Sequence, residues 1–502
     1  MEYESTRGDC RSIMSAEAIK KGISPDGGLF VPMEGISVSP GDIEAMATMN
    51  YRERAIKILA PYLSDFTPDE VTHCVESAYN ANNFDHPAVA PLVVLNNKLS
   101  VLELWHGPTC AFKDMALQIL PHLLVTSMDK TGEKAGLLIL VATSGDTGKA
   151  ALEGFKDVPR TAVMVFYPAK GVSQVQKLQM ITQEGGNVGV AAVRGNFDDT
   201  QSGVKDIFGS GVMGEKTAAQ GFKFSSANSI NWGRLAPQIV YYFSAYADLL
   251  GQKQINPGQA VNFVVPTGNF GNILAGFYAR EMGLPINKLI CAANENNVLT
   301  DFIRTGAYDR NRDFKKTVSP SMDILISSNL ERLLFELTGH DAPRVREWMS
   351  RLKTAGRYNV DPGTAEKVGE LFWSHFASDR ETMLSIRQTY NRYNYVVDTH
   401  TAVGLNVYDK YRAGTGDDTP TVVLSTASPF KFNASVASAL LGDEQTAGKS
   451  EFQLLQMLSA FSGLPIPQGL RNLEMRPVLH EKVADREEMP ETVLSFVSRL
   501  IK

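Results

Sequence analysis

The feature that most constrains the fold of this chain is a repeated order of segments: an apolar run, a glycine-rich loop and then a helical pattern. Leu137 to Ala142 (LLILVA) leads into TSGDTG and the helical pattern of Lys149 to Phe155. Val261 to Val265 leads into PTGNFGN and the helical pattern of Ile273 to Met282. Similar apolar runs lie at residues 162–166 and 188–193. Short runs that are apolar throughout are typical of strands buried on both faces, so the pattern predicts an α/β fold with parallel strands.

The two glycine-rich loops are candidate anion-binding sites. Backbone N–H groups at a helix start lack partners within the helix, and glycines let an anion approach them closely. The loop TGNFGN lacks the Lys-Ser/Thr pair of a nucleotide-binding P-loop. It also lacks the three-glycine spacing of a dinucleotide-binding loop, and we expect no strand ahead of Glu295, the nearest acidic residue at the expected distance. A phosphate without a nucleotide therefore fits better, and a nicotinamide oxidoreductase is disfavoured.

Lys113 is the candidate nucleophile. It lies in LWHGPTCAFKDM, at the junction of a loop and the largely apolar helical run from Met115 to Leu124. A helix N-terminus and apolar surroundings both disfavour the ammonium form, so we expect a lowered pKa. A neutral amine can form an imine with a carbonyl group. The alternative is a lysine that caps a surface helix.

Several other polar side chains leave two readings open. Cys110 is either a second nucleophile or a buried structural thiol. His400, in DTHTAVG, is either a structural or capping residue or a base, because no carboxylate partner can be assigned from sequence. Asn231 and Arg234 head a long apolar helix in NSINWGRLAPQIVYY and either cap it or bind a ligand. The strand at 421–424 runs into hydroxyl residues, at the end of a strand where open α/β sheets bind ligands.

Composition limits the partners of the chain. The net charge of −6 and the lack of a lysine- or arginine-rich block argue against nucleic acid, which favours a small-molecule partner. No apolar run approaches the roughly 20 residues of a membrane span, and no secretory signal is visible at the start. The four cysteines are scattered without a CxxC pair, which predicts reduced thiols, a cytoplasmic location and no metal site. Oligomeric state stays open between a monomer and a homodimer.

Changes in hydrophobic pattern along the chain suggest its domain organisation. Residues 1–95 are mostly helical, with SAEAIKKGI as a short helix ended by Gly22 and a short strand at 29–31. A catalytic core is expected from residue 96 to 502, with a nested smaller subdomain at about 135–225. A polar helical insertion without catalytic residues is expected at about 300–395, and a helical C-terminal extension at about 436–502.

A lysine at a loop-to-helix junction and two anion cradles are the parts that pyridoxal phosphate chemistry requires. The motifs HGPTCAFKD, TSGDTG, NSINWGR, PTGNFGN and DTHTAVG, with STRG and DGGLFVP near the start, resemble those of the threonine synthase family. The resemblance runs from Tyr3 to about Phe432. It implies the architecture of fold-type-II pyridoxal phosphate enzymes: two open, mostly parallel sheets flanked by helices, with a mainly helical N-terminal domain and a helical C-terminal extension.

The resemblance also implies roles for individual residues. Lys113 would carry pyridoxal 5′-phosphate and Thr426 would face its pyridine nitrogen. The cofactor phosphate would be bound by Gly268, Asn269, Phe270, Gly271 and Asn272. The substrate would be bound by Ser144, Gly145, Asp146, Thr147, Asn231 and Arg234, with Lys177 and Arg7 as further candidates for its phosphate. Asp146 stands where asparagine is usual in fold type II, and an ionised carboxylate there would repel a substrate carboxylate, so we expect its partner on the ring side or in a basic residue.

The reaction that the resemblance implies is conversion of O-phospho-L-homoserine and water to L-threonine and phosphate, the last step of threonine biosynthesis. Lys113, released from the cofactor, would remove protons from the substrate. A related amino-acid lyase, such as an O-phosphohomoserine phospho-lyase or a threonine dehydratase, would share the same loops. A non-catalytic ligand-binding homologue is the second alternative, which an intact Lys113 argues against.

Overall fold

The computed structural model describes residues 1–10, 12–143 and 145–501. Its larger sheet has six strands in the order β14-β11-β10-β15-β5-β4, and every neighbouring pair is parallel except the β4–β5 hairpin. The strands are β4 (Leu92–Asn96), β5 (Leu99–Glu103), β10 (Val261–Pro266), β11 (Ile286–Ala293), β14 (Phe372–Phe376) and β15 (Thr421–Ser425). Both β10 and β15 are buried along their whole length, as expected for continuously apolar runs.

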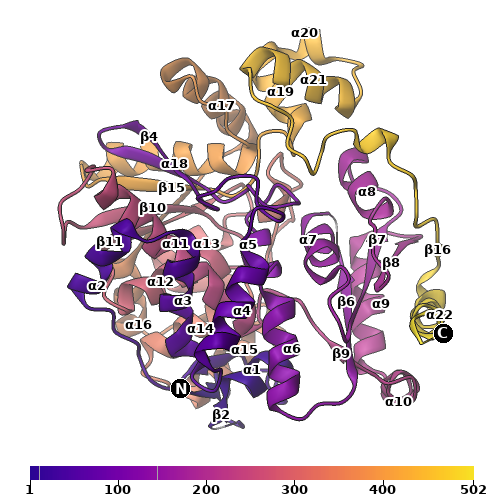
Figure 1. Ribbon diagram of the computed structural model, residues 1–502. Coiled ribbons are helices and arrows are strands. Elements are labelled where there is room, and N and C mark those ends of the chain that lie inside the picture. Colours follow the sequence, from indigo (N-terminus) through magenta and orange to yellow (C-terminus); the bar gives the residue numbers. More distant parts are fainter. Residues whose placement is uncertain (11, 144, 502) are drawn as a thin grey trace.

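Helices cover both faces of this sheet (Figure 1). The covering helices are α11 (Trp232–Gly251), α12 (Gly271–Glu281), α13 (Val298–Thr305), α16 (Pro362–Leu371) and α18 (Thr399–Thr415). The long helix α18 packs across β10, β11, β14 and β15, whereas α12 packs on β10 and β11 and is itself covered by α11. The strand β14 lies within the region that the sequence predicts to be helical, and that expectation is wrong there. Its residues FWSHF pair with β11 at the sheet edge. The strand β11 also ends just before Glu295, where the sequence predicts no strand.

The smaller sheet has five parallel strands in the order β16-β8-β7-β6-β9. They are β6 (Gly136–Ala142), β7 (Thr161–Pro168), β8 (Val188–Val193), β9 (Phe222–Ser225) and β16 (Val483–Ala484). The helices packed around it are α7 (Asp146–Phe155), α8 (Gln174–Ile181), α9 (Phe197–Gly209), α10 (Gly211–Ala219) and α22 (Met489–Leu500). The expected fold class, two mostly parallel sheets flanked by helices, is therefore confirmed.

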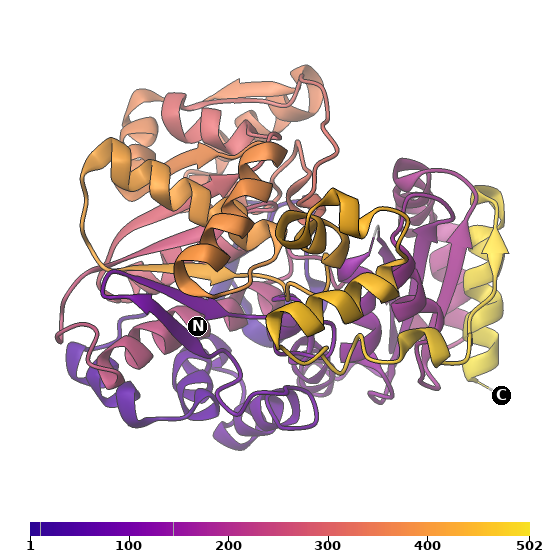
Figure 2. The ribbon, with the colours of Figure 1, turned by 90° about the horizontal axis from the view of Figure 1, so that it is seen from above.

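The C-terminal segment joins the two sheets. It leaves the larger part through α19 (Asn433–Leu441), α20 (Asp443–Thr446) and α21 (Glu451–Ser462), and then crosses to the outer edge of the smaller sheet (Figures 1 and 2). There β16 pairs with β8, and α22 packs on α9 and β7. The sequence predicts only helices in this segment, so β16 is an addition to that prediction.

The N-terminal segment packs along α11, from its start at Trp232 to Asp248 near its end. It contains a three-stranded antiparallel sheet and several helices, and the first helix ends at Gly22 as expected, with a φ of 70° that favours glycine. Its elements are β1 (Glu2–Ser5), β2 (Ile13–Met14), β3 (Phe30–Pro32), α1 (Ser15–Lys21), α2 (Pro40–Ala45), α3 (Tyr51–Leu59) and α4 (Pro68–Ala78). Tyr3 and Tyr62 pack edge-on against Trp232, with ring centroids 5.5 and 5.4 Å away. This contact fixes the end of α11 that also carries Arg234.

The helices around Lys113 and in the region after α13 complete the fold. They are α5 (Asp114–Leu117), α6 (Leu120–Lys130), α14 (Leu330–Leu337), α15 (Ala342–Ala355) and α17 (Asp379–Tyr393). The expected single helix from Met115 to Leu124 is divided into α5 and α6, because Pro121 lacks the N–H that a continuous helix needs there and instead suits the first turn of α6. None of the described helices combines the length and apolar content that a membrane crossing requires.

Candidate functional site

Direct contacts bring together the loops that follow β5, β6, β10 and β15. The Lys113 Nζ lies 3.4 Å from the Asp146 Oδ2. The backbone N–H of Phe112, the neighbour of Lys113, donates to the carbonyl of Thr426 at 2.8 Å. The loop at Gly268 touches the same cluster from another side, since a Cβ there would lie 3.0 Å from the carbonyl oxygen of Ser321, whose hydroxyl donates to Asp146. Residues predicted from separate motifs thus form one site.

Lys113 is the residue that immediately precedes α5, and its side chain is 14% exposed. Its ammonium lies 5.3 Å from the ring centroid of Phe112. Burial lowers the pKa of Lys113, and the positive charges of Lys431 and Arg234 lower it further, whereas Asp146 raises it. The balance favours an amine that can lose its proton more readily than an exposed lysine.

Asp146 is the charged centre of the site. Its Oδ1 accepts from Gln176 Nε2 at 3.0 Å and lies 3.1 Å from Lys431 Nζ. Its Oδ2 accepts from the Ser321 hydroxyl at 2.7 Å and faces Lys113. The two ammonium groups are the main reason that the pKa of this buried carboxyl lies far below its ordinary value, since burial alone would raise it. Of the two partners considered for Asp146, the ring side or a basic residue, the structure places basic residues there, Lys113 and Lys431.

The loop between β10 and α12 presents unpaired backbone donors. Among the described residues, the backbone N–H groups of residues 268–273 have no hydrogen-bond acceptor, and the first helical bond of α12 is donated by Leu274. Phe270 has a φ of 63°, a left-handed conformation that turns the chain into the helix. Asn272 accepts hydrogen bonds from the Tyr241 and Tyr242 hydroxyls, while its own buried Nδ2 has no partner in the described part of the chain. Such a loop can bind an anion through its backbone.

Thr426 follows β15 and is 5% exposed. Its hydroxyl makes no hydrogen bond to any described residue, although its carbonyl is held by the Lys113 loop. The preceding hydroxyl, of Ser425, accepts from Trp105 Nε1 at 3.0 Å and from Thr401. Of the two hydroxyls at this strand end, the Thr426 hydroxyl is thus the one free to bind a ligand.

Arg234 and Asn231 have different positions in the site. Arg234 is 4% exposed, and its Nη1 donates to the Ala227 carbonyl at 2.6 Å, but its Nε has no acceptor among the described residues. Asn231 instead accepts from the Gly233 N–H and donates to the Ile19 carbonyl, both at 2.9 Å. Its side chain therefore caps α11, the structural reading left open by the sequence, and Arg234 retains unpaired donors for an anion.

The remaining candidates for an anion are placed elsewhere. Arg7 forms a bidentate ion pair with Glu331, both contacts at 2.9 Å, and Lys177 is exposed on α8. Ser144 lies outside the described residues. Gly145 is packed so closely that an added Cβ would lie 2.5 Å from the Gln176 side chain, and Thr147 is partly exposed in the first turn of α7.

His400 and Cys110 have structural surroundings. The Nδ1 of His400 lies 2.7 Å from Asp398 Oδ2, and its Nε2 accepts the Ser321 N–H at 3.1 Å. The histidine thereby positions Ser321 next to Asp146, and Asp398 is the carboxylate partner that the sequence could not assign. Burial raises the pKa of the Cys110 thiol to about 12, which makes it an inert thiol rather than a nucleophile.

Sequence reasoning missed Lys431 and Ser321. Lys431 had a usable signal, because it is the one charged residue between Thr419 and Gly442. Ser321 had none, since it lies in the polar region predicted to lack catalytic residues, and its position depends on His400.

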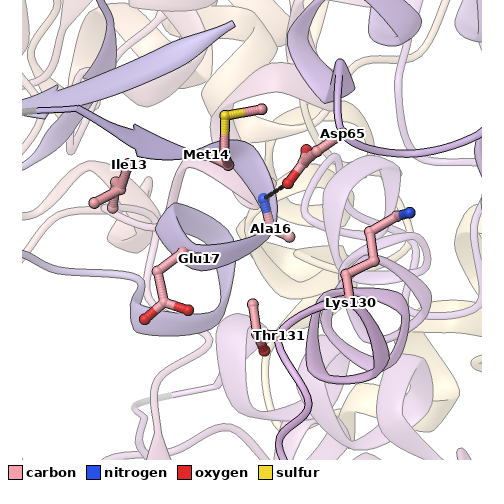
Figure 3. Close-up of a pocket in the computed structure, with 7 residues that line it drawn as sticks. All are labelled: Ile13, Met14, Ala16, Glu17, Asp65, Lys130 and Thr131. Atoms are coloured by element: carbon pink, nitrogen blue, oxygen red, sulfur yellow. Dashed lines mark hydrogen bonds between the residues drawn. The ribbon is translucent and has the colours of Figure 1, made fainter.

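The structure also has a pocket of about 480 Å³ that shares no residue with this site (Figure 3). It is lined by Ile13, Met14, Ala16, Glu17, Asp65, Lys130 and Thr131. The carboxylate of Asp65 accepts from the Ser15 hydroxyl and, at 3.0 Å, from the Ala16 N–H, so the start of α1 already has an anionic partner.

Comparison with known proteins identifies the family. The family models for the threonine synthase N terminus and the threonine synthase C-terminal region match residues 2–79 and 401–496. Threonine synthase of Pseudomonas aeruginosa is 39% identical over 88% of this chain and 91% of its own length. The chain belongs to the threonine synthase family. Human threonine synthase-like 1 is also 39% identical, over 98% of this chain, but the chain spans 66% of the length of that protein.

A solved structure of the family agrees with the fold. The structure of pyridoxal-phosphate-bound threonine synthase from Brucella melitensis superposes with a TM-score of 0.88 at 36% identity, and the match covers 100% of both chains. This match confirms the expected fold-type-II architecture. It also covers the C-terminal crossing, which the sequence did not predict.

Proposed function

We propose that this chain is a threonine synthase that uses pyridoxal 5′-phosphate to convert O-phospho-L-homoserine and water to L-threonine and phosphate. The observation that carries this proposal is the largely buried amine of Lys113, held opposite Asp146 and beside a loop of unpaired backbone donors. Family membership makes the same reaction the first one to test.

The residues present fit this cofactor. The unpaired N–H groups of residues 268–273 suit a phosphate, and the free hydroxyl of Thr426 suits an uncharged pyridine nitrogen. Lys113 would hold the cofactor covalently. When bound, pyridoxal phosphate supplies an aldehyde for the amino group of the substrate and a ring that accepts electrons from the neighbouring carbon.

The side chains of the site would transfer protons and bind the substrate phosphate. Lys113, once its amine is free and neutral, can take a proton from the substrate carbon and return it. Arg234 is buried and its Nε has no acceptor among the described residues, so it can bind the substrate phosphate and stabilise it as it leaves the γ-carbon. Water must then add at the β-carbon, which distinguishes a synthase from a phospho-lyase.

A product assay with O-phospho-L-homoserine tests the proposal. The purified full chain, supplied with pyridoxal 5′-phosphate, should release threonine and phosphate in equal amounts. Release of phosphate with 2-oxobutyrate would instead identify a phospho-lyase. No turnover of phosphohomoserine, combined with no visible absorbance after cofactor addition, would identify a non-catalytic homologue.

A further inference from the structure

Lys431 is a buried cation without an assigned role. Its side chain is fully buried behind the site, at the end of the segment that follows β15. Its Nζ donates to the Thr109 carbonyl at 2.6 Å and lies 3.1 Å from Asp146 Oδ1. A buried ammonium is costly unless it is paired, so its position depends on Asp146.

Asp146 is shared between two amines. Lys431 contacts Oδ1, and Lys113 contacts Oδ2 at 3.4 Å. One carboxylate can balance only one of the two ammonium charges. Lys431 is the closer partner and also donates to the Thr109 carbonyl, whereas Lys113 is farther from the carboxylate and has no other acceptor among the described residues. The site therefore disfavours a second ammonium charge, and Lys113 is the lysine that stays neutral.

The other charged groups around the site have partners of their own or add positive charge. Asp114 accepts from the hydroxyl and the N–H of Thr109, and burial raises its pKa to about 6. His400 is paired with Asp398. Arg234, on α11, adds a further positive charge near Lys113, and the thiol of Cys110 beside Lys431 is kept neutral by its raised pKa. No second carboxylate among the described residues contacts the Lys113 amine.

We propose that Lys431 is a positioning residue that neutralises Asp146 and so keeps the Lys113 amine uncharged when it is not bound to the cofactor. Asp146 holds both lysines in place, and Lys431 determines which of them carries the proton. This inference deepens the proposed function, because a neutral Lys113 is the form that reacts with a carbonyl group and that accepts a proton from the substrate.

The test measures the protonation of Lys113 directly. The full chain, freed of bound carbonyl compounds, is exposed briefly to a small acylating reagent at a series of pH values. Modification of Lys113 is then quantified by peptide mass spectrometry, and the pH midpoint of its reactivity is compared between variants. Circular dichroism confirms that each variant is folded, and protection of the buried Lys149 confirms it for the variants that keep this lysine.

Two substitutions should move this midpoint in opposite directions. Lys431→Met leaves Lys113 as the sole ammonium on Asp146, so its midpoint should rise by about 1 to 3 pH units, the usual effect of an opposite charge at this distance. Asp146→Asn should lower the midpoint below that of the wild type. Lys431→Arg keeps the charge, so its midpoint should resemble that of the wild type. Lys431→Gln keeps a donor for the Thr109 carbonyl and replaces Lys431→Met if that variant does not fold. Its midpoint should show the same rise.

Lys149 provides a matched control. Lys149, on α7, is a buried lysine like Lys431, but it pairs with Glu153 at 2.6 Å rather than with Asp146. Lys149→Met should therefore leave the Lys113 midpoint unchanged. An unchanged midpoint in folded Lys431→Met or Lys431→Gln, or an equal shift in Lys149→Met, would overturn the inference. The labelling needs neither cofactor nor substrate, so a chain with these shifts but without threonine release would overturn the proposed function alone.

Discussion

The loops after β6 and β10 share one design but differ in charge. Each follows a buried strand and opens a helix, α7 or α12. The β10–α12 loop presents backbone N–H groups, and its nearest polar side chains are uncharged amides and hydroxyls. The β6–α7 loop places Asp146 in the first turn of its helix, with the amines of Lys113 and Lys431 on the carboxylate. The two anion cradles expected from the sequence are therefore not equivalent.

This difference assigns different tasks to the two loops. A neutral loop can bind an anion without changing protonation over the physiological pH range, which suits a permanently held group. A loop centred on a carboxylate between two lysines responds to the loss or gain of a single proton. Four kinds of substitution test this difference between the loops. They remove the Lys113 amine, neutralise Asp146, introduce a carboxylate at Asn272, or remove one hydroxyl beside each loop.

The largest effect is expected for Lys113→Ala, which removes the nucleophile. Activity should fall by at least about 10³-fold, because both covalent attachment and proton transfer are lost. The visible absorbance of the cofactor-bound enzyme should disappear together with threonine release. Lys205→Ala, at an exposed position on α9, is the matched control and should change neither readout. Retention of both signals in Lys113→Ala would place the nucleophile elsewhere.

Asp146→Asn discharges the charged loop and should lower the free energy of unfolding by about 3 kcal/mol near pH 7, because the buried Lys431 ammonium loses its counter-charge. The pKa of Asp146 is lower in the folded than in the unfolded chain, where it is about 3.9. The unfolded wild type therefore binds more protons as the pH falls below about 4, and the difference between wild type and variant should shrink there. Urea unfolding between pH 3 and 7 measures the difference in free energy of unfolding between the wild type and Asp146→Asn. A difference that is constant with pH would contradict an ionised Asp146.

Asn272→Asp makes the neutral loop resemble the charged one. The new carboxylate keeps the acceptor used by Tyr241 and Tyr242 but repels a bound phosphate, so affinity for pyridoxal 5′-phosphate should fall by about 100-fold. Titration with the cofactor, followed by absorbance, measures this change. Asn272→Ala is the control: it removes one acceptor of the Tyr241 and Tyr242 hydroxyls, which keep the Gln238 side chain and the backbone carbonyl at position 272 as acceptors. It should therefore cost about 1 kcal/mol of stability, and it should weaken cofactor binding less than Asn272→Asp. Equal losses of affinity would mean that charge is not the deciding property of this loop.

Much of this comparison could be predicted from the sequence, because the strands in question are continuous apolar runs. Such runs, together with the loops that follow them, indicate both the parallel sheets and the edge at which ligand-binding residues gather. The strand β16 could not be predicted in this way, since it has two residues and is defined only by its pairing with β8. The same holds for β14, whose strand character depends on the adjacent β11.

The charged part of the site was less predictable than the neutral part. Backbone donors at a helix start follow from local sequence, so the 268–272 loop could be proposed directly. The protonation of Lys113 depends instead on Lys431, which is far away in the chain, and on the depth at which both are buried. Sequence gives residue types but not these distances, and for that reason Asp146 could be expected to need a basic partner without that partner being identified.

The smallest effects should come from removing one hydroxyl beside each loop. Ser321 donates to Asp146 Oδ2 at 2.7 Å, and Ser327 donates to the Gly268 carbonyl at 2.9 Å. Ser321 is exposed, so water can replace much of its hydrogen bond, and Ser321→Ala should cost little stability. It should still raise the midpoint of Lys113 reactivity by a few tenths of a pH unit, roughly the effect of one lost donor to a carboxylate. Ser327→Ala, at a buried site, should cost about 1 kcal/mol of stability and leave the midpoint unchanged. The opposite assignment, with Ser327→Ala moving the midpoint and Ser321→Ala not, would mean that the neutral loop also controls the charge on Lys113.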